Sequence, residues 1–106
     1  MNFDTILVDK KEAIATITID RPQKLNALNK TTLLELNTVL TTLESDINTQ
    51  VIIITGSGEK AFVAGADIAE FANFSVAEGQ NLARKGQEIV FNFIENFSKP
   101  VIAAIN

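Results

Sequence analysis

The chain has 106 residues, at most one domain, and its hydrophobic fraction of 46% and charged fraction of 21% are ordinary for a folded globular protein. Cysteine and histidine are absent, which excludes disulfides, thiolate zinc sites and hydrolases that take a Ser-His-Asp or Cys-His arrangement from this chain alone. A net charge of −4, with nine Lys and Arg, argues against binding to nucleic acid.

The amino-terminal residues lack the apolar core of a signal peptide. The apolar runs are only a few residues long, far below the roughly 20 that cross a membrane. We therefore expect a soluble, cytoplasmic protein with neither a membrane nor a nucleic-acid partner.

The first two predicted strands form a hairpin. Residues 6–8 are a short apolar run, and residues 13–19 (AIATITI) alternate Ile with Thr or Ala, as in a strand with one buried face. Residues 9–12 between them are the expected turn. Pro22 ends the second strand because it has no N–H to donate to a neighbour.

A helix is predicted from residue 31, capped by Asn29, Thr31 or Thr32. Its apolar residues recur at intervals of three and four, which places them on one helical face: Leu33, Leu36, Leu40, Leu43 and Ile47. The next strand, residues 51–55 (VIIIT), is apolar throughout, as expected of a strand covered on both faces. A Gly-Ser-Gly turn at residues 56–58 ends it.

Two further helices and a last strand complete the pattern. Asp67 opens a predicted short helix toward Phe74, and Ser75 with Glu78 fits the capping box of the next helix. The apolar face of that helix carries Leu82, Ile89, Phe93 and Phe97. Pro100 stops it, and residues 101–105 (VIAAI) are the expected buried final strand.

Strand–helix–strand crossings imply parallel strands joined by right-handed connections, with helices covering the sheet. The predicted class is therefore α/β. Because a domain rarely stops on a buried strand, we expect the chain to be an incomplete portion of a larger domain.

The stretch most suggestive of chemistry is residues 59–70 (EKAFVAGADIAE), in which small side chains cluster. Small residues let a ligand approach the backbone closely. If a helix begins at Asp67, the amide of Ala66 lies at its positive end and could stabilise an oxyanion, an effect of about 2.7–4 kcal/mol per donor. Close packing or a tight turn explains the same small residues. The Gly-Ser-Gly turn matches neither a phosphate loop nor a nucleophile elbow.

Three segments resemble the motifs of one known family. Residues 60–68 (KAFVAGADI) resemble a K-A-F-x-A-G-A-D-[IL] segment, residues 19–29 (IDRPQKLNALN) an R-P-x-x-x-N-A-[LM] stretch, and residues 99–106 (KPVIAAIN) a K-P-[VT]-[IV]-A-A-[IV]-[NS] strand. The family that they resemble is the crotonase superfamily (enoyl-CoA hydratase/isomerase family). The order and spacing match as well. Three segments in order are more specific than any one of them.

The resemblance implies the amino-terminal part of the crotonase (ClpP/crotonase-like) fold, with repeated strand–helix units and a mostly parallel sheet. Residues 1–106 would be an incomplete amino-terminal portion of a single crotonase-like domain. The implied activity of the full-length parent is enoyl-CoA hydratase-type: syn addition of water to a 2-enoyl-CoA through an oxyanion-stabilised thioester enolate. The second oxyanion amide and the catalytic glutamates would follow residue 106, so we expect this chain alone to be inactive.

Site residues are implied position by position. The backbone N–H of Ala66 maps to the first oxyanion donor, and the residues around it would line the acyl-CoA pocket: Ala64, Gly65, Ala66, Asp67 and Ile68. Lys24, Leu25 and Ala27 match positions that contact the CoA nucleotide.

Several charged and polar residues have structural interpretations instead. Lys24 is equally well an ordinary exposed lysine, and Asp67 a helix cap. We expect Asn26 to tie its loop together rather than touch substrate. Three glutamates match no catalytic position and are interpreted as surface charges: Glu59, Glu70 and Glu78.

Coenzyme A is expected as part of the substrate, with no metal and no prosthetic group, and the family implies a trimer or a dimer of trimers. Three alternatives remain. One is another crotonase reaction, such as isomerisation, thioester hydrolysis or ring-forming synthesis. Another is a non-catalytic CoA-binding or structural α/β module. The third, a Clp-type serine protease, is disfavoured by the absence of histidine.

Overall fold

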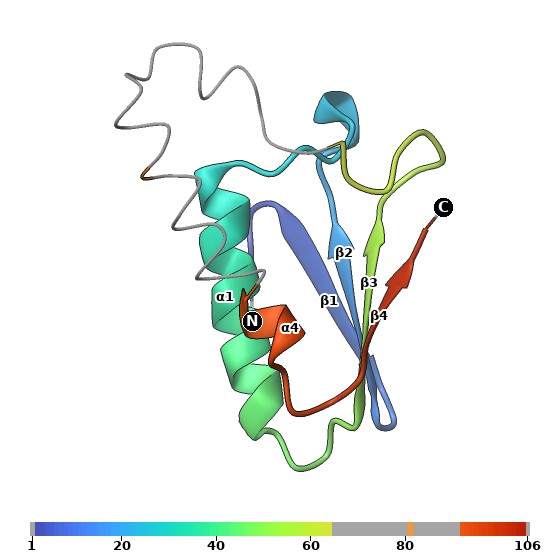
Figure 1. The fold of residues 1–106 in the computed structure, drawn as a ribbon. Helices are drawn as coiled ribbons and strands as arrows, with labels where there is room; N and C mark the ends of the chain where they lie inside the picture. The colour runs from blue at the N-terminus through green and yellow to red at the C-terminus, as the bar shows by residue number, and fades with distance from the viewer. Residues whose placement is uncertain (1, 65–80, 82–91, 106) are drawn as a thin grey trace.

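The computed structural model describes residues 2–64, 81 and 92–105 (Figure 1). In this part of the chain one four-stranded sheet has the order β1-β2-β3-β4. The strands are β1 (Ile6–Lys11), β2 (Ile14–Ile19), β3 (Val51–Gly56) and β4 (Val101–Ala104). The β1–β2 pair is antiparallel, whereas β2–β3 and β3–β4 are parallel. The predicted α/β class with a mostly parallel sheet is confirmed.

The hairpin turn is shorter than predicted. Asp9 and Lys11 belong to β1, where they pair with Thr16 and Ile14, so only two residues connect the strands. Glu12, the first of them, has φ 57. The prediction of a turn over residues 9–12 was wrong because β1 lies at the edge of the sheet, where charged side chains are common in strands.

Helix α1 (Lys30–Ser45) follows a 3₁₀ turn, η1 (Pro22–Lys24). Of the three candidate caps, Asn29 is confirmed: its Oδ1 accepts hydrogen bonds from the Thr32 N–H (2.8 Å) and hydroxyl (2.7 Å). Ile47, expected on the apolar face, lies beyond the helix and is 91% exposed. Asp46 ends the helix because its Oδ1 accepts from the Asn48 N–H (3.0 Å) and turns the chain.

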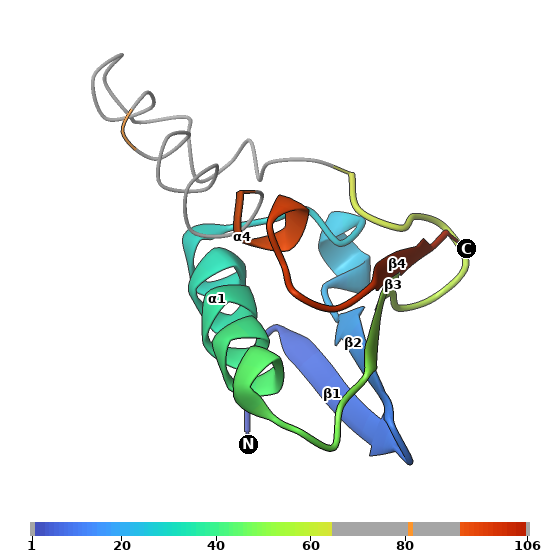
Figure 2. The ribbon, with the colours of Figure 1, turned by 60° about the horizontal axis from the view of Figure 1, so that its bottom comes forward.

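The core lies between one face of the sheet and the helices. Helices α1 and α4 (Asn92–Glu95) both lie on this face (Figures 1 and 2). The buried apolar side chains of this core cluster come from β1, β2, β3 and α1: Ile6, Ala15, Ile17, Ile19, Ile52, Leu36, Val39, Leu40 and Leu43. Phe93 and Phe97, predicted on an inward face, are partly buried against this core with ring centroids 5.5 Å apart.

Two strands are less buried than predicted. In β3 only Ile52 and Gly56 are buried, and in β4 Val101 is half-buried while Ile102 is 51% exposed. Among the described residues no helix covers the second face of the sheet, and β4 pairs only with β3. An apolar run therefore overestimates burial here, because it does not reveal which faces have a neighbour.

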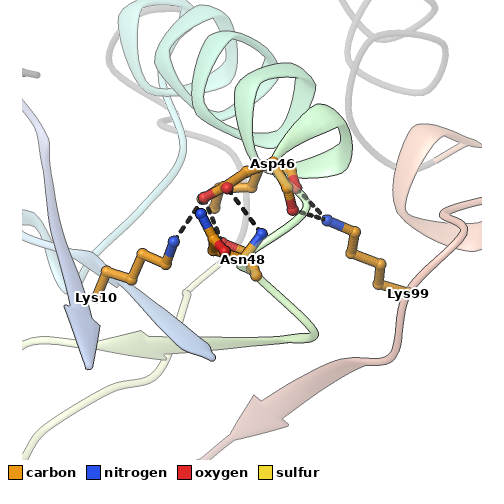
Figure 3. Close-up of polar contacts among 6 residues, drawn as sticks. Lys10, Asp46, Asn48 and Lys99 are labelled. Atoms are coloured by element: carbon orange, nitrogen blue, oxygen red, sulfur yellow. Dashed lines mark hydrogen bonds and ion pairs between the residues drawn. The ribbon is translucent and has the colours of Figure 1, made fainter. Parts of the chain in front are cut away.

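The amino ends of the parallel strands are held together at the end of α1 (Figure 3). The Lys99 ammonium donates to the carbonyl oxygens of Leu43 and Asp46, each at 2.6 Å. Lys10 forms an ion pair with the Asp46 carboxylate at 2.7 Å. Hydrogen bonds from Lys10, and then from Asn48 and Thr49, hold the pKa of Asp46 well below its ordinary value. These contacts of Lys10, Asp46 and Lys99 fix the start of β4 at the amino ends of the parallel strands, opposite the end of the sheet from which the loops described next emerge.

Several predicted features lie outside the described residues: the helix from Asp67 to Phe74, the capping box of Ser75 and Glu78, and the positions of Leu82 and Ile89. None of the helices that are described is both long and apolar enough to cross a membrane.

Candidate functional site

Two loops meet at the carboxyl ends of β2 and β3. One comprises residues 20–29 and contains η1, and the other comprises residues 57–64. Because β2 and β3 are parallel and adjacent, both loops leave the same edge of the sheet, at the top of Figure 1. The crevice at this edge is where ligands usually bind in open α/β sheets.

The side chain of Asn26 joins the two loops. It is 1% exposed and has φ 57, a conformation that asparagine tolerates better than most residues. Its Oδ1 accepts from the Arg21 N–H (2.9 Å), and its Nδ2 donates to the carbonyls of Ser57 (3.0 Å) and Ala61 (2.9 Å). The expectation that Asn26 organises its own loop is confirmed, and the structure extends that role to the loop after β3.

Gly56 permits the second loop to fold back over the end of β3. A Cβ atom at this position would lie 2.1 Å from the Phe62 carbonyl oxygen, 2.8 Å from that of Ala61 and 2.8 Å from the Asn26 Nδ2. Sequence reasoning treated this glycine only as a turn residue. The available signal was a glycine at the last position of a strand, which often marks close backbone approach.

The structure brings some of the predicted site residues together. Leu25 is 46% exposed, and its carbonyl oxygen accepts a hydrogen bond from the Ala64 N–H at 3.1 Å. Ala27 is 8% exposed, and its carbonyl oxygen accepts from the Arg21 guanidinium. Lys24 is exposed at the end of η1, which fits both a contact to a ligand phosphate and an ordinary surface lysine.

The remaining predicted positions lie outside the described residues: Gly65, Ala66, Asp67 and Ile68, as well as Glu70 and Glu78. Glu59 is exposed, in agreement with its interpretation as a surface charge.

A cleft of about 200 Å³ separates the tips of the two loops. Its walls combine backbone, small side chains and charge: Pro22, Leu25, Asn26, Ser57, Gly58, Glu59, Lys60 and Ala61. Within the described ranges, no three His, Cys, Asp or Glu side chains gather as they would around a metal ion. The chemistry available here is hydrogen bonding from backbone groups and attraction of anions by Lys60, which Glu59 in the same wall opposes.

The sequence matches the family model of enoyl-CoA hydratase/isomerase over residues 9–106. It is 47% identical to a crotonyl-CoA hydratase of Syntrophomonas wolfei and 42% identical to a short-chain-enoyl-CoA hydratase of Clostridium acetobutylicum, in each case over 100% of this chain and 40% of the relative. The chain thus spans about 40% of the length of the curated relatives it matches.

The fold agrees with solved structures as well. The crystal structure of an enoyl-CoA hydratase from Bacillus anthracis superimposes with a TM-score of 0.86 at 36% identity, over 97% of this chain and 40% of the other. This chain therefore resembles that enzyme both in sequence and in fold. The chain belongs to the enoyl-CoA hydratase/isomerase family and has the fold of an amino-terminal portion of a crotonase.

Proposed function

We propose that this chain supplies the CoA-binding side and one oxyanion donor of an enoyl-CoA hydratase-type active site. The supporting observation is that the Asn26 side chain joins the two loops at the carboxyl edge of the sheet, where the carbonyl of Leu25 meets the amide of Ala64. Residues of two of the matched segments, 19–29 and 60–68, which are far apart in sequence, therefore lie side by side. Membership of the family adds the acyl-CoA chemistry to that geometry.

Each residue has a proposed role. Lys24, Leu25 and Ala27 contact the CoA nucleotide, with the Lys24 ammonium beside a phosphate. Ala64, Gly65, Asp67 and Ile68 line the pocket around the thioester. The backbone N–H of Ala66 donates to the thioester oxygen as negative charge develops on it.

The proposed reaction of the whole protein is hydration of a 2-enoyl-CoA through an enolate. The enolate oxygen accepts hydrogen bonds from Ala66 and a second amide, while two glutamates position water and transfer protons. We place the second amide and both glutamates outside residues 1–106, within a single domain of which these residues are the amino-terminal portion. We therefore expect no hydration of crotonyl-CoA by this chain alone, and turnover by the full-length parent. Turnover by the isolated chain would contradict this assignment.

The binding role is tested by calorimetric titration of the chain with acetoacetyl-CoA. Saturable binding is expected, and Ala66→Pro should abolish it because proline has no N–H. Ala66→Gly is the matched control, since it retains the amide and should bind like the native chain. Equal affinity of the proline and native chains would refute the oxyanion role of Ala66. Loss of binding in both variants would place the effect in the side chain instead.

The cytoplasmic location and the trimeric assembly remain predictions. Light scattering of the full-length parent tests the second of them, and a monomeric mass would contradict it.

A further inference from the structure

The Asn26 side chain divides its hydrogen-bonding groups between the two loops. Both N–H donors of its Nδ2 are used on the loop after β3, at the carbonyls of Ser57 (3.0 Å) and Ala61 (2.9 Å). Its Oδ1 accepts from the Arg21 N–H (2.9 Å) in its own loop and, at a longer 3.4 Å, from the Ser57 hydroxyl. Because the side chain is 1% exposed and both its donors are engaged, it acts on the site through the loops rather than on a ligand.

The loop after β3 is held in place just before the proposed oxyanion donor. Beyond the two carbonyls that Asn26 holds, the Ala64 N–H donates to the carbonyl of Leu25 at 3.1 Å. Ala66 follows Ala64 by only two residues, and two residues span at most about 7 Å. A displacement of the loop would therefore be passed on to the Ala66 amide.

The two residues that hold this loop have left-handed backbone conformations. Leu25 has φ 53 and Asn26 has φ 57. Asparagine tolerates this region, whereas a leucine there is uncommon. Such conformations persist only where the surrounding structure determines them, and they cluster at functional sites. Here the Asn26 N–H donates to the Arg21 carbonyl (2.8 Å) and the Leu25 N–H to that of Pro22 (3.1 Å), so backbone hydrogen bonds hold the strained pair.

We propose that Asn26 is a positioning residue for the reaction: through its Nδ2 it sets the position of the Ala66 amide, without contacting the acyl-CoA itself. This role rests on the proposed function and adds to it the residue that controls oxyanion stabilisation. An oxyanion donor acts at about 2.7–3.1 Å from the developing charge, and a misplacement of about 1 Å can cost about a hundredfold in rate.

The test is Asn26→Asp, which keeps the size and the acceptor oxygen of the side chain but replaces the two N–H donors by an oxygen that repels the carbonyls. The chain is titrated by calorimetry with acetoacetyl-CoA and with CoA, which has no thioester oxygen. Both ligands carry the same phosphates, so the ratio of their dissociation constants is insensitive to the added charge. The native preference for acetoacetyl-CoA should fall about tenfold in the variant. An unchanged ratio would overturn the proposal.

Asn29→Asp is the matched control, because it adds the same charge to the same loop. Aspartate retains the oxygen that accepts from the Thr32 N–H and caps α1, so the fold is preserved. The ratio of the two dissociation constants should equal that of the native chain. A fall as large as that of Asn26→Asp would assign the effect to charge and refute the positioning role.

Turnover of crotonyl-CoA by the full-length parent separates positioning from general stability. Asn26→Asp should lower kcat about a hundredfold and leave KM within about threefold. Added to Ala66→Pro, it should lower kcat no further, because two residues that act through one interaction are not additive. The same fall in kcat with and without Ala66→Pro, or a change in KM alone, would refute the proposal.

Failure of this proposal can be distinguished from failure of the proposed function. Acetoacetyl-CoA binding that Ala66→Pro abolishes, together with a native ratio in Asn26→Asp, would preserve the proposed function and remove the positioning role. A native chain that binds both ligands equally, or neither, would remove both. If circular dichroism shows that Asn26→Asp is unfolded, Asn26→Gly accepts the positive φ, removes the same donors and should show the same fall in the ratio.

Discussion

Replacing Asn26 should disconnect the two loops that form the candidate site. Asn26→Ala removes three hydrogen bonds of 3.0 Å or less, together with a longer one of 3.4 Å from the Ser57 hydroxyl, and leaves the Ser57 and Ala61 carbonyls and the Arg21 amide without their Asn26 partner. Each lost bond contributes about 0.5–1.5 kcal/mol, and the positive φ of residue 26 disfavours alanine by a further 1–2 kcal/mol or so. We expect a loss of about 3–5 kcal/mol, a large share of the roughly 5–15 kcal/mol typical of a domain.

The loss is measured by urea unfolding followed by far-ultraviolet circular dichroism, because the chain has no Trp and no Tyr. The midpoint should fall by roughly 1–5 M, because the free energy of unfolding falls by about 1–3 kcal/mol per M of urea. Asn26→Gly separates the two causes, since glycine accepts the positive φ and should recover about 1 kcal/mol relative to alanine. Asn2→Ala, at an exposed position, is the control and should change stability by less than about 0.5 kcal/mol. If Asn26→Ala matched this control, the proposed connection between the loops would be refuted.

Gly56→Ala should destabilise the chain by about 3 kcal/mol, because the new Cβ would lie 2.1 Å from the Phe62 carbonyl oxygen. Gly58→Ala should cost only about 1 kcal/mol, because residue 58 has open space around it and only its φ of 76 disfavours alanine. Equal losses of stability for the two variants in urea unfolding would contradict the clash at residue 56. Burial raises the pKa of Glu35, but hydrogen bonds from the Thr5 hydroxyl and from the Asp4 and Thr5 amides outweigh it, so the pKa lies below 4.5. The carboxylate therefore stabilises the fold above pH 4.5 and loses this effect as the pH falls through the lowered pKa. Glu35→Gln should be less stable than the native chain by about 1 kcal/mol at neutral pH, and this difference should shrink as the pH falls below 4.5; a pH-independent difference would contradict this. Lys99→Met removes the two hydrogen bonds to the end of α1 and should reduce stability by about 1–2 kcal/mol. Lys11→Met, at an exposed position of β1, is the control and should have little effect. A loss of stability no larger for Lys99→Met than for Lys11→Met would argue against a stabilising role of the Lys99 contacts with Leu43 and Asp46.

Local patterns predicted most of the elements. The alternation of Ile with Thr located β2, and the spacing of Leu36, Leu40 and Leu43 located α1 and its buried face. These periods directly reflect which side of an element meets the core. Ile47 continued the same spacing but lies beyond the helix, because the Asp46 side chain accepts from the Asn48 N–H and turns the backbone there.

Contacts between segments distant in sequence could not be predicted in the same way. Asn26 and Ala61 are 35 residues apart, and nothing local to either indicates that they share a hydrogen bond. The clash that excludes a side chain at Gly56 depends equally on where the loop after β3 returns. The matched segments indicated which residues belong to the site, whereas the structure shows how Leu25 and Ala64 come together.

The most direct test of the account is a backbone N–H correlation spectrum of the chain titrated with acetoacetyl-CoA. The account predicts saturable shifts confined to one edge of the sheet, at Leu25, at Ala27 and at residues 64–68. The amides of Asn48 and Thr49, at the opposite edge beside Asp46, should not move. Shifts at that opposite edge, or no saturable shift at residues 24–27 and 64–68, would contradict the assignment of this site to acyl-CoA.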